Sequence, residues 1–270
     1  QSVTEGETVI WFVDAADAAD KRLTTDGLHL LAQSAAGVVN HRTDPGGVVK
    51  QSFLYRGESS ELLLFFNGWS MDERAVAHLA SGGLDVLALW DYTEPDTAFF
   101  AELSRYRKIH LAAWSLGVFT AAKLLAGHAI EFASATAFNG TLRPVDAAFG
   151  IAPEIFRGTA EHWGEELARS RFFQRVAGGR AELEAFPLPC RTPEEQQREL
   201  FALEQAAQGA LPVNCFRLAV VGTRDRIFPP EAQTAFWQSV QTPILSLDLP
   251  HYPFAEFHSF REVTDLGEHR

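Results

Sequence analysis

The sequence of 270 residues is poor in cysteine, carries no excess of positive charge and contains no long apolar run. Its two cysteines, Cys190 and Cys215, stand far apart, without a C-x-x-C pair or a nearby cluster of histidines. This spacing argues against a disulfide framework and a zinc site, and it indicates free, mostly buried thiols in a reducing compartment. We therefore expect neither a metal nor a cofactor.

The other absences concern membranes and nucleic acid. No apolar run approaches the roughly 20 residues that a transmembrane helix needs, and no basic segment precedes an apolar one at the N-terminus. The formal net charge of -12 argues against binding to nucleic acid or to an anionic membrane, because both select basic surfaces. We expect a soluble, cytoplasmic protein. Gln1 stands where Met would start a chain, which indicates processing or excision from a longer protein.

Hydrophobic residues make up 46% of the chain, enough for a sizeable core, and they gather in short runs typical of buried strands. The expected strands lie at residues 62–66, 86–90, 109–113, 133–138, 216–221 and 244–249. Helical patterns lie at residues 74–80, 96–104, 116–126 and 231–240. This alternation predicts an α/β fold with a mostly parallel, doubly wound sheet covered on both faces.

The interval between the fourth and fifth expected strands is too long for a structureless loop. It contains helical patterns at residues 160–176 and 193–208, so we expect an inserted helical lid at about residues 141–209 of a domain spanning 49–270. Residues 1–48 contain a strand-like segment, TVIWFV, and a helix-like one, TTDGLHLLAQSAAGVV. They are either an N-terminal extension at the sheet edge or the tail of a fused module.

The stretch AAWSLGV places Ser115 where an expected strand meets an expected helix. A nucleophile on such a tight turn needs small residues two positions before and two after it, and these are Ala113 and Gly117. The pattern usually begins with glycine, so alanine is a mild departure from it. The alternative is a serine that caps the helix.

A serine nucleophile requires a histidine base and an orienting acid, which follow it after late strands in the doubly wound hydrolases. Asp225 follows the expected strand at residues 216–221, and His251 follows the last one. Two competitors remain. Asp91 ends a strand at the same sheet edge but precedes the serine, and His258 lies beyond the strand end.

Acyl transfer also requires donors for the oxyanion of the tetrahedral intermediate. One would be the backbone N–H of Leu116, which follows the nucleophile. The second would be the N–H of Trp69, because the dipeptide Asn67-Gly68 makes a tight turn directly after the first expected strand. The alternative for this loop is a plain strand-to-helix turn with an aromatic residue on the core.

The expected lid carries the basic stretch RSRFFQRVAGGR, which contains no acidic residue. Arg171 and Arg175 would be one helical turn apart on a shared face, with Arg169 close by. Such a run is either a solvated helix face or a docking site for an acidic carrier or a phosphate-bearing arm. We take these three arginines and Trp114 as candidates for substrate binding.

Five motifs in order, ELLLFFNGWSMDE, WDY, AAWSLGV, FNGTLRPVDAAFGIAPEIF and HYPF, resemble the BioG family of pimeloyl-[acyl-carrier protein] methyl ester esterases. The similarity runs over about residues 50–270, and the tryptophan before the serine also resembles the W-S-x-G of the related esterase BioH. The resemblance implies an α/β-hydrolase fold and hydrolysis of the methyl ester of pimeloyl-[acyl-carrier protein] in biotin synthesis. The implied partner is the acyl-carrier protein with its methyl-pimeloyl chain.

By the same resemblance, Ser115 would be the nucleophile, His251 the base and Asp225 the acid, with Trp69 and Leu116 as oxyanion donors. Residues 1–48 have no counterpart in the family, which leaves open a fusion to another enzyme of the biotin pathway. Two other functions remain open: hydrolysis of another acyl ester or thioester, and a catalytically inactive scaffold.

Overall fold

The computed structural model describes residues 3–5, 8–10, 49–94 and 96–268. The chain divides into two compact units, Gln1–Val38 and Val39–Arg270. In the first unit the described residues form an antiparallel pair, β1 (Val3–Glu5) and β2 (Thr8–Ile10). The strand-like segment expected from residue 8 onward thus begins as β2, whereas the helix-like segment lies outside the described residues.

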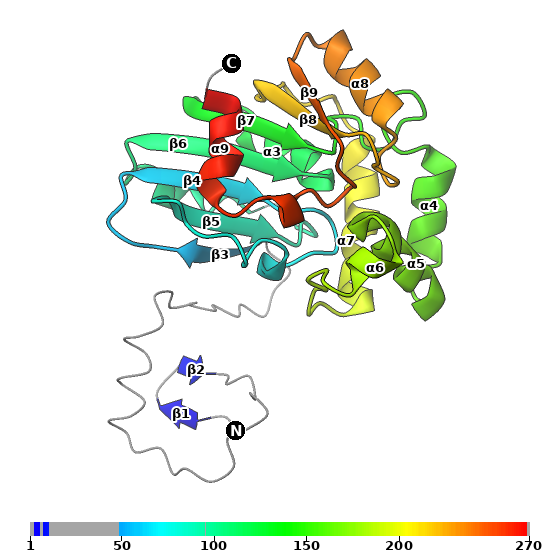
Figure 1. Ribbon diagram of the computed structural model, residues 1–270, viewed down its shortest axis with the longest axis horizontal. Coiled ribbons are helices and arrows are strands. Elements are labelled where there is room, and N and C mark those ends of the chain that lie inside the picture. The colour runs from blue at the N-terminus through cyan, green and yellow to red at the C-terminus, as the bar shows by residue number, and fades with distance from the viewer. Residues whose placement is uncertain (1–2, 6–7, 11–48, 95, 269–270) are drawn as a thin grey trace. The chain divides into compact units, whose positions relative to one another are not determined.

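The second unit is built on a seven-stranded sheet in the order β3-β5-β4-β6-β7-β8-β9 (Figure 1). The strands are β3 (Lys50–Tyr55), β4 (Glu61–Phe66), β5 (Asp85–Trp90), β6 (Lys108–Trp114), β7 (Phe132–Phe138), β8 (Leu218–Gly222) and β9 (Ile244–Leu247). All are parallel except the edge strand β3, which pairs antiparallel with β5. The expected mostly parallel α/β sheet is confirmed.

Consecutive side chains of β4 show why its apolar run is continuous. Phe65 packs edge-to-face on Phe254 and Phe260, which belong to the short helix η2 (Phe254–Glu256) and to α9 (Phe260–Glu268). Phe66 points to the opposite face and packs on Phe99, at the start of α2 (Phe100–Leu103). Both faces of the strand are therefore buried, as parallel sheets require. The other helices beside the sheet are α3 (Leu116–Leu125) and α8 (Pro230–Ser239).

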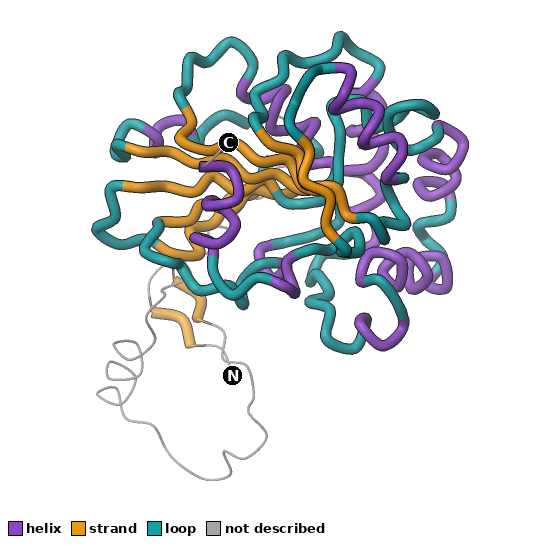
Figure 2. Tube along the Cα trace, turned by 45° about the horizontal axis from the view of Figure 1, so that its top comes forward, coloured by secondary structure: helices purple, strands orange, loops and turns teal. Residues whose placement is uncertain are grey.

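Between β7 and β8 the chain leaves the sheet and forms the inserted helices α4 (Pro153–Glu161), α5 (Glu166–Ala177), α6 (Arg180–Leu183) and α7 (Pro193–Ala207). Figures 1 and 2 show these helices gathered at one end of the sheet, the end to which β6 and β7 point. They lie where the carboxyl ends of parallel strands present ligand-binding residues in open α/β sheets. No helix in the described part of the chain is long and apolar enough to cross a bilayer.

Three details of the expected secondary structure were wrong. The single helix expected over residues 160–176 is two helices, interrupted at buried Trp163, whose ring lies 4.4 Å from that of Trp69. The helix expected at residues 74–80 is only η1 (Glu73–Ala75), because the backbone of Ala80 pairs with that of His258 and Phe260 instead. The helix expected at residues 96–104 shortens to α2.

Strand β3 was missed in the sequence, since an edge strand that is partly exposed lacks a long apolar run.

Candidate active site

Ser115 occupies the turn between β6 and α3 with φ 58° and ψ -128°. A residue with a side chain is strained in this region, and such strain is typical of the nucleophile elbow. Its hydroxyl makes no capping hydrogen bond to α3. The helix-capping alternative therefore does not describe this serine, whose hydroxyl is directed elsewhere.

Close backbone packing around the elbow explains the small residues beside it. A Cβ atom added to Gly117 would lie 2.3 Å from the carbonyl oxygen of Asn67. A Cβ atom added to Gly140, which follows β7, would lie 2.3 Å from the carbonyl oxygen of Ser115. Ala113 is fully buried between β4 and β7, where it pairs with Phe66 and Ala137. The elbow thus needs small residues from two strand ends.

Three side chains that are distant in sequence form a hydrogen-bonded chain at this edge of the sheet. His251 Nε2 lies 2.9 Å from the hydroxyl oxygen of Ser115, and its Nδ1 lies 2.8 Å from Oδ2 of Asp225. All three residues are buried: Ser115 is 5% exposed, His251 2% and Asp225 6%. The carboxylate accepts a hydrogen bond from Nδ1–H, which leaves Nε2 as the acceptor that faces the serine hydroxyl.

Hydrogen-bond donors of the backbone and of a side chain hold the carboxylate of Asp225 in place. Its Oδ1 accepts hydrogen bonds from the backbone N–H groups of Ile227 at 2.8 Å and Phe228 at 3.0 Å. Its Oδ2 also accepts one from the side-chain amide of Gln233 at 3.0 Å. The ring of Phe228 lies parallel to that of His251, within 10°. These hydrogen bonds fix the orientation of the carboxylate toward the imidazole.

The two competitors lie in other environments. Asp91 forms ion pairs with Arg191 at 3.0 Å and Lys50 at 3.1 Å. Burial opposes ionisation of this carboxyl, but the charge of Arg191 and hydrogen bonds outweigh it and lower the pKa of Asp91. The side chain of His258 is 90% exposed and faces Glu262. Neither residue is hydrogen-bonded to Ser115.

The expected oxyanion donors border the same cavity as the serine. Trp69 and Leu116 both line it, and in the described part of the chain neither backbone N–H donates to a protein acceptor. The loop that carries Trp69, residues 67–72, is called the oxyanion loop below. Asn67 braces it by accepting from the Gly68 N–H at 3.0 Å and donating to the carbonyl oxygen of Asp72 at 2.6 Å.

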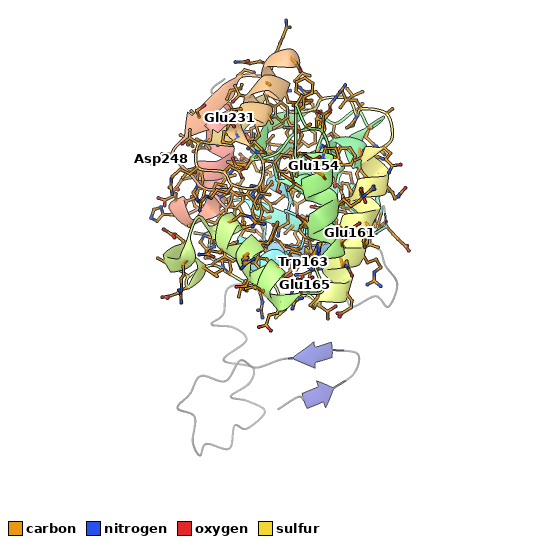
Figure 3. All side chains as sticks on the ribbon, turned by 90° about the vertical axis from the view of Figure 1, so that its right-hand side faces the viewer. Glu154, Glu161, Trp163, Glu165, Glu231 and Asp248 are labelled. Atoms are coloured by element: carbon orange, nitrogen blue, oxygen red, sulfur yellow. The ribbon has the colours of Figure 1, made fainter. Side chains whose placement is uncertain are left out.

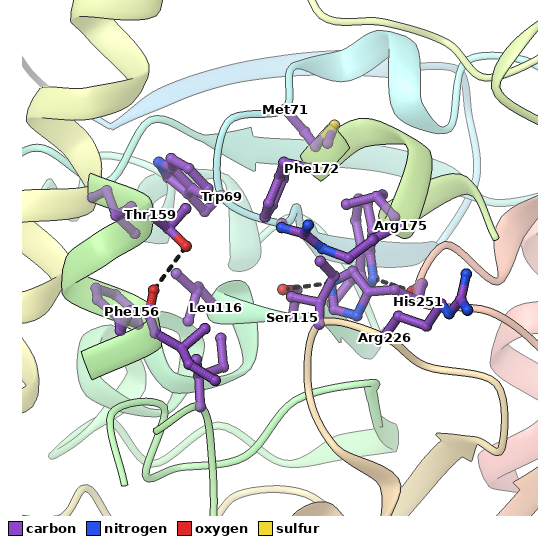
Figure 4. Close-up of a pocket in the computed structure, with 17 residues that line it drawn as sticks. Trp69, Met71, Ser115, Leu116, Phe156, Thr159, Phe172, Arg175, Arg226 and His251 are labelled. Carbon is purple, nitrogen blue, oxygen red and sulfur yellow. Dashed lines mark hydrogen bonds between the residues drawn. The ribbon is translucent and has the colours of Figure 1, made fainter. Parts of the chain in front are cut away.

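The cavity over Ser115 has a volume of about 320 Å³ and is lined mainly by apolar side chains (Figure 4). Besides the elbow and the oxyanion loop, it is bordered by Ile151, Ile155, Phe156, Thr159, Phe172, Val176, Leu200 and Ile227. Most of these come from the inserted helices, so the insertion shapes the space in which an acyl chain would lie. Among the described residues, no cluster of histidine, cysteine and acidic side chains could hold a metal ion.

Only some of the expected arginines reach this cavity. Arg175 lines it together with Arg226, which sequence reasoning missed although it directly follows Asp225. Burial, with repulsion from Arg171 and Arg226, lowers the pKa of Arg175, and no described carboxylate pairs with it. Arg169 instead donates to the carbonyl oxygen of Trp163 at 2.8 Å and borders a separate cavity. Trp114 lines the main cavity but is 1% exposed.

The sheet, its crossover connections and the strained serine at a strand end define the class of α/β-hydrolases. Residues 50–263 match the family described as pimeloyl-ACP methyl esterase BioG. The chain belongs to this family of esterases, which functions in biotin synthesis. The resemblance noted in the sequence is thereby confirmed.

Known relatives support this assignment. An uncharacterized protein of Haemophilus influenzae is 37% identical over 215 residues, which are 78% of this chain and 96% of that protein. The crystal structure of BioG from Haemophilus influenzae superposes with a TM-score of 0.73 at 35% identity, covering 80% of this chain and 100% of that one. A thermophilic esterase from Thermogutta terrifontis shares the fold, with a TM-score of 0.59 at 16% identity over 81% of this chain and 91% of that one.

One further relative is a longer protein. The malonyl-[acyl-carrier protein] O-methyltransferase of Bacteroides fragilis is 35% identical over 196 residues, which are 71% of this chain. The matched residues make up 39% of that protein, so this chain spans less than half of its length.

Proposed function

We propose that this protein hydrolyses the methyl ester of pimeloyl-[acyl-carrier protein]. The observation that carries the proposal is the hydrogen-bonded chain from Asp225 through His251 to Ser115, which opens on an apolar cavity. Membership of the BioG family supplies the substrate.

In the proposed mechanism the hydroxyl oxygen of Ser115 attacks the ester carbonyl while His251 Nε2 takes its proton. The negative charge that develops on the carbonyl oxygen is stabilised by the N–H groups of Trp69 and Leu116, and removal of one such donor costs about 3 kcal/mol in other enzymes. The protonated imidazole then gives its proton to the departing methanol. Water then enters, loses a proton to His251 and attacks the acyl-enzyme. As the serine oxygen leaves, the imidazolium returns this proton to it, which releases the free carboxylate and restores the serine hydroxyl.

The charges around the cavity favour a carrier-bound substrate. The chain as a whole has a net charge of -12, so an acidic carrier protein needs a local basic surface to approach it. On α4, Glu154 and Glu161 are exposed (Figure 3), and the exposed Arg157 is already paired with Glu204. Arg175 and Arg226 flank His251 at the cavity (Figure 4) and leave donors for a phosphodiester. The phosphate-bearing arm would therefore enter on this side.

The Bacteroides fragilis relative supports a further part of the proposal. An O-methyltransferase acting on a carrier-bound malonyl group makes a methyl ester, the bond that an esterase of this kind removes. A unit similar to this chain forms part of that longer protein, so the proposed activity is compatible with fusion to another enzyme of the same pathway.

The test uses methyl-pimeloyl carrier protein as substrate and measures methanol release, with the Ser115→Ala variant as the control. We expect release that depends on Ser115 and a much higher kcat/KM than for free p-nitrophenyl esters. Equal turnover of free esters would instead identify a general esterase. A lack of labelling of Ser115 by a fluorophosphonate would identify an inactive scaffold.

A further inference from the structure

One turn of the lid helix α7 holds three successive groups of the oxyanion loop. The indole N–H of Trp69 donates to the backbone carbonyl of Gln196 at 2.7 Å. The side-chain amide of Gln196 donates to the carbonyl oxygen of Ser70 at 3.0 Å. The N–H of Ser70 donates to Oε2 of Glu199, three residues further along the helix, at 3.3 Å. The residue that supplies the expected oxyanion donor is thus tied to the lid through its side chain and its following peptide.

The side chains that make these contacts are buried polar groups. Glu199 is 0% exposed and Gln196 is 3% exposed. The second carboxylate oxygen of Glu199 accepts from the N–H of Tyr92 at 3.0 Å, and Arg191 pairs with Glu199 at 2.5 Å and with Asp91 at 3.0 Å. Burying such charges is costly, and apolar residues of similar volume would stabilise a helix interface as well or better. Stability alone therefore does not explain why α7 presents these residues.

The oxyanion loop needs external support because its own conformation is strained. Ser70 has φ 70°, which is unfavourable for a residue with a side chain. Without its partners, the peptide on either side of Ser70 would relax and carry the Trp69 N–H with it. A donor stabilises an oxyanion only when it is already aimed at the position where the charge develops.

We propose that Gln196 and Glu199 are positioning residues that keep the N–H of Trp69 directed into the oxyanion position. The inserted lid then does more than cover the acyl chain, because its helix α7 completes the catalytic geometry of the core sheet. This inference rests on the proposed esterase activity.

The experiment compares variants of α7 in matched pairs. Glu199→Gln is compared with Glu204→Gln, because Glu204 lies on the same helix and also pairs with an arginine, Arg157 at 2.9 Å, but does not touch the loop. Gln196→Leu is compared with Gln197→Leu, since the side chain of Gln197 donates to the carbonyl oxygen of Ala160 at 2.7 Å. Both controls disturb the packing of α7 on α4 alone.

For a small p-nitrophenyl ester, we expect Glu199→Gln and Gln196→Leu to lower kcat about 10- to 100-fold, below the 10²–10³-fold loss of a whole donor, with KM changed less than about twofold. The affinity of a trifluoromethyl ketone, which forms a tetrahedral oxyanion on the serine, should fall by the same factor. Amide hydrogen exchange of residues 67–72 should accelerate in these two variants. The two controls should keep kcat, inhibitor affinity and loop exchange within about twofold of the unmodified protein.

The positioning role would be overturned if kcat fell equally in a test variant and in its matched control. It would also be overturned if amide exchange of the oxyanion loop were unchanged in both Glu199→Gln and Gln196→Leu. If Glu199→Gln fails to fold, the comparison of Gln196→Leu with Gln197→Leu is sufficient for the test. A wild-type protein that hydrolyses no ester would contradict the proposed function and not this inference, for which the exchange comparison still gives the answer.

Discussion

The indole N–H of Trp114 donates a 2.8 Å hydrogen bond to the backbone carbonyl of His251. The residue that precedes Ser115 thus holds His251, which faces the serine hydroxyl. The side-chain amide of Asn139, at the end of β7, donates to the same carbonyl at 2.9 Å. Two side chains at strand ends therefore fix the backbone of His251. The distance between the serine hydroxyl and the imidazole thus depends on these buried hydrogen bonds.

The role of the acid is tested by Asp225→Asn. The amide cannot stabilise the imidazolium that forms when Ser115 loses its proton, and it favours the wrong tautomer of His251, so we expect kcat for ester hydrolysis to fall about 10⁴-fold. Asp248→Asn is the control, since this carboxylate lies on the neighbouring loop and its side chain is 83% exposed. A loss of less than tenfold in Asp225→Asn would reject the assignment.

The backbone strain at Ser115 is tested by comparing two variants that lack its hydroxyl. Glycine adopts φ 58° and ψ -128° far more readily than alanine, which retains a Cβ atom. Strain of this kind costs about 1–3 kcal/mol, so we expect Ser115→Gly to exceed Ser115→Ala in free energy of unfolding by about 1 kcal/mol after the entropy of glycine is subtracted. Denaturant titration measures the difference, and a more stable alanine variant would show that the turn stores no strain.

The close approach of Gly140 to the elbow leads to a third prediction. A methyl group there would meet the carbonyl oxygen of Ser115, so Gly140→Ala should lower the free energy of unfolding by about 1–3 kcal/mol and displace the serine. Gly158→Ala on α4 is the control, because a Cβ atom at that position meets nothing within 4 Å. This control should gain up to about 1 kcal/mol from the helix propensity of alanine. Equal thermal stabilities of the two variants would contradict the prediction.

Substitution of Arg175 and of Arg169 should affect KM differently, because only Arg175 lines the main cavity. Arg175→Ala removes a cation at the cavity, so we expect KM for the carrier-bound methyl ester to rise about tenfold at low salt, and less at high salt. KM for a free p-nitrophenyl ester should not change. Arg169→Ala should leave both KM values unchanged, since its guanidinium is used on Trp163. Equal KM increases in the two variants would show that the basic run acts only through its overall charge.

The two thiols should differ in reactivity. Burial raises the pKa of Cys215 to about 12, whereas Cys190 is exposed, so the expectation of two mostly buried thiols was wrong for Cys190. Only the thiolate reacts with a disulfide reagent, so at pH 8 about one part in 10⁴ of Cys215 is reactive. We expect one equivalent of thiol to react rapidly with the reagent, and this reaction should be lost in Cys190→Ser. The second equivalent, from Cys215, should react slowly, at a rate that rises about tenfold per pH unit. Two equivalents reacting at similar rates would show that Cys215 is accessible.

Local patterns were sufficient to predict the framework of this protein. Six strands of the sheet are readable from apolar runs, because a strand buried on both faces is apolar throughout. The positions of Ser115, Asp225 and His251 after three of these strands followed from the same pattern, since parallel strands bring their carboxyl ends to one edge. Their catalytic roles stay predictions, but their proximity needed no tertiary information beyond the strand order of the fold class.

Only the tertiary structure decided what supports that edge. The contacts involved have no local signature. Asn139 and Trp114 hold the carbonyl of His251 from distant parts of the chain, and Gln196 holds Ser70 across 126 positions of sequence. The break between α4 and α5 has the same origin, because Trp163 leaves the helical pattern to pack on Trp69. Periodicity reports which face of an element is buried, whereas a hydrogen bond between distant segments exists only after the chain has folded.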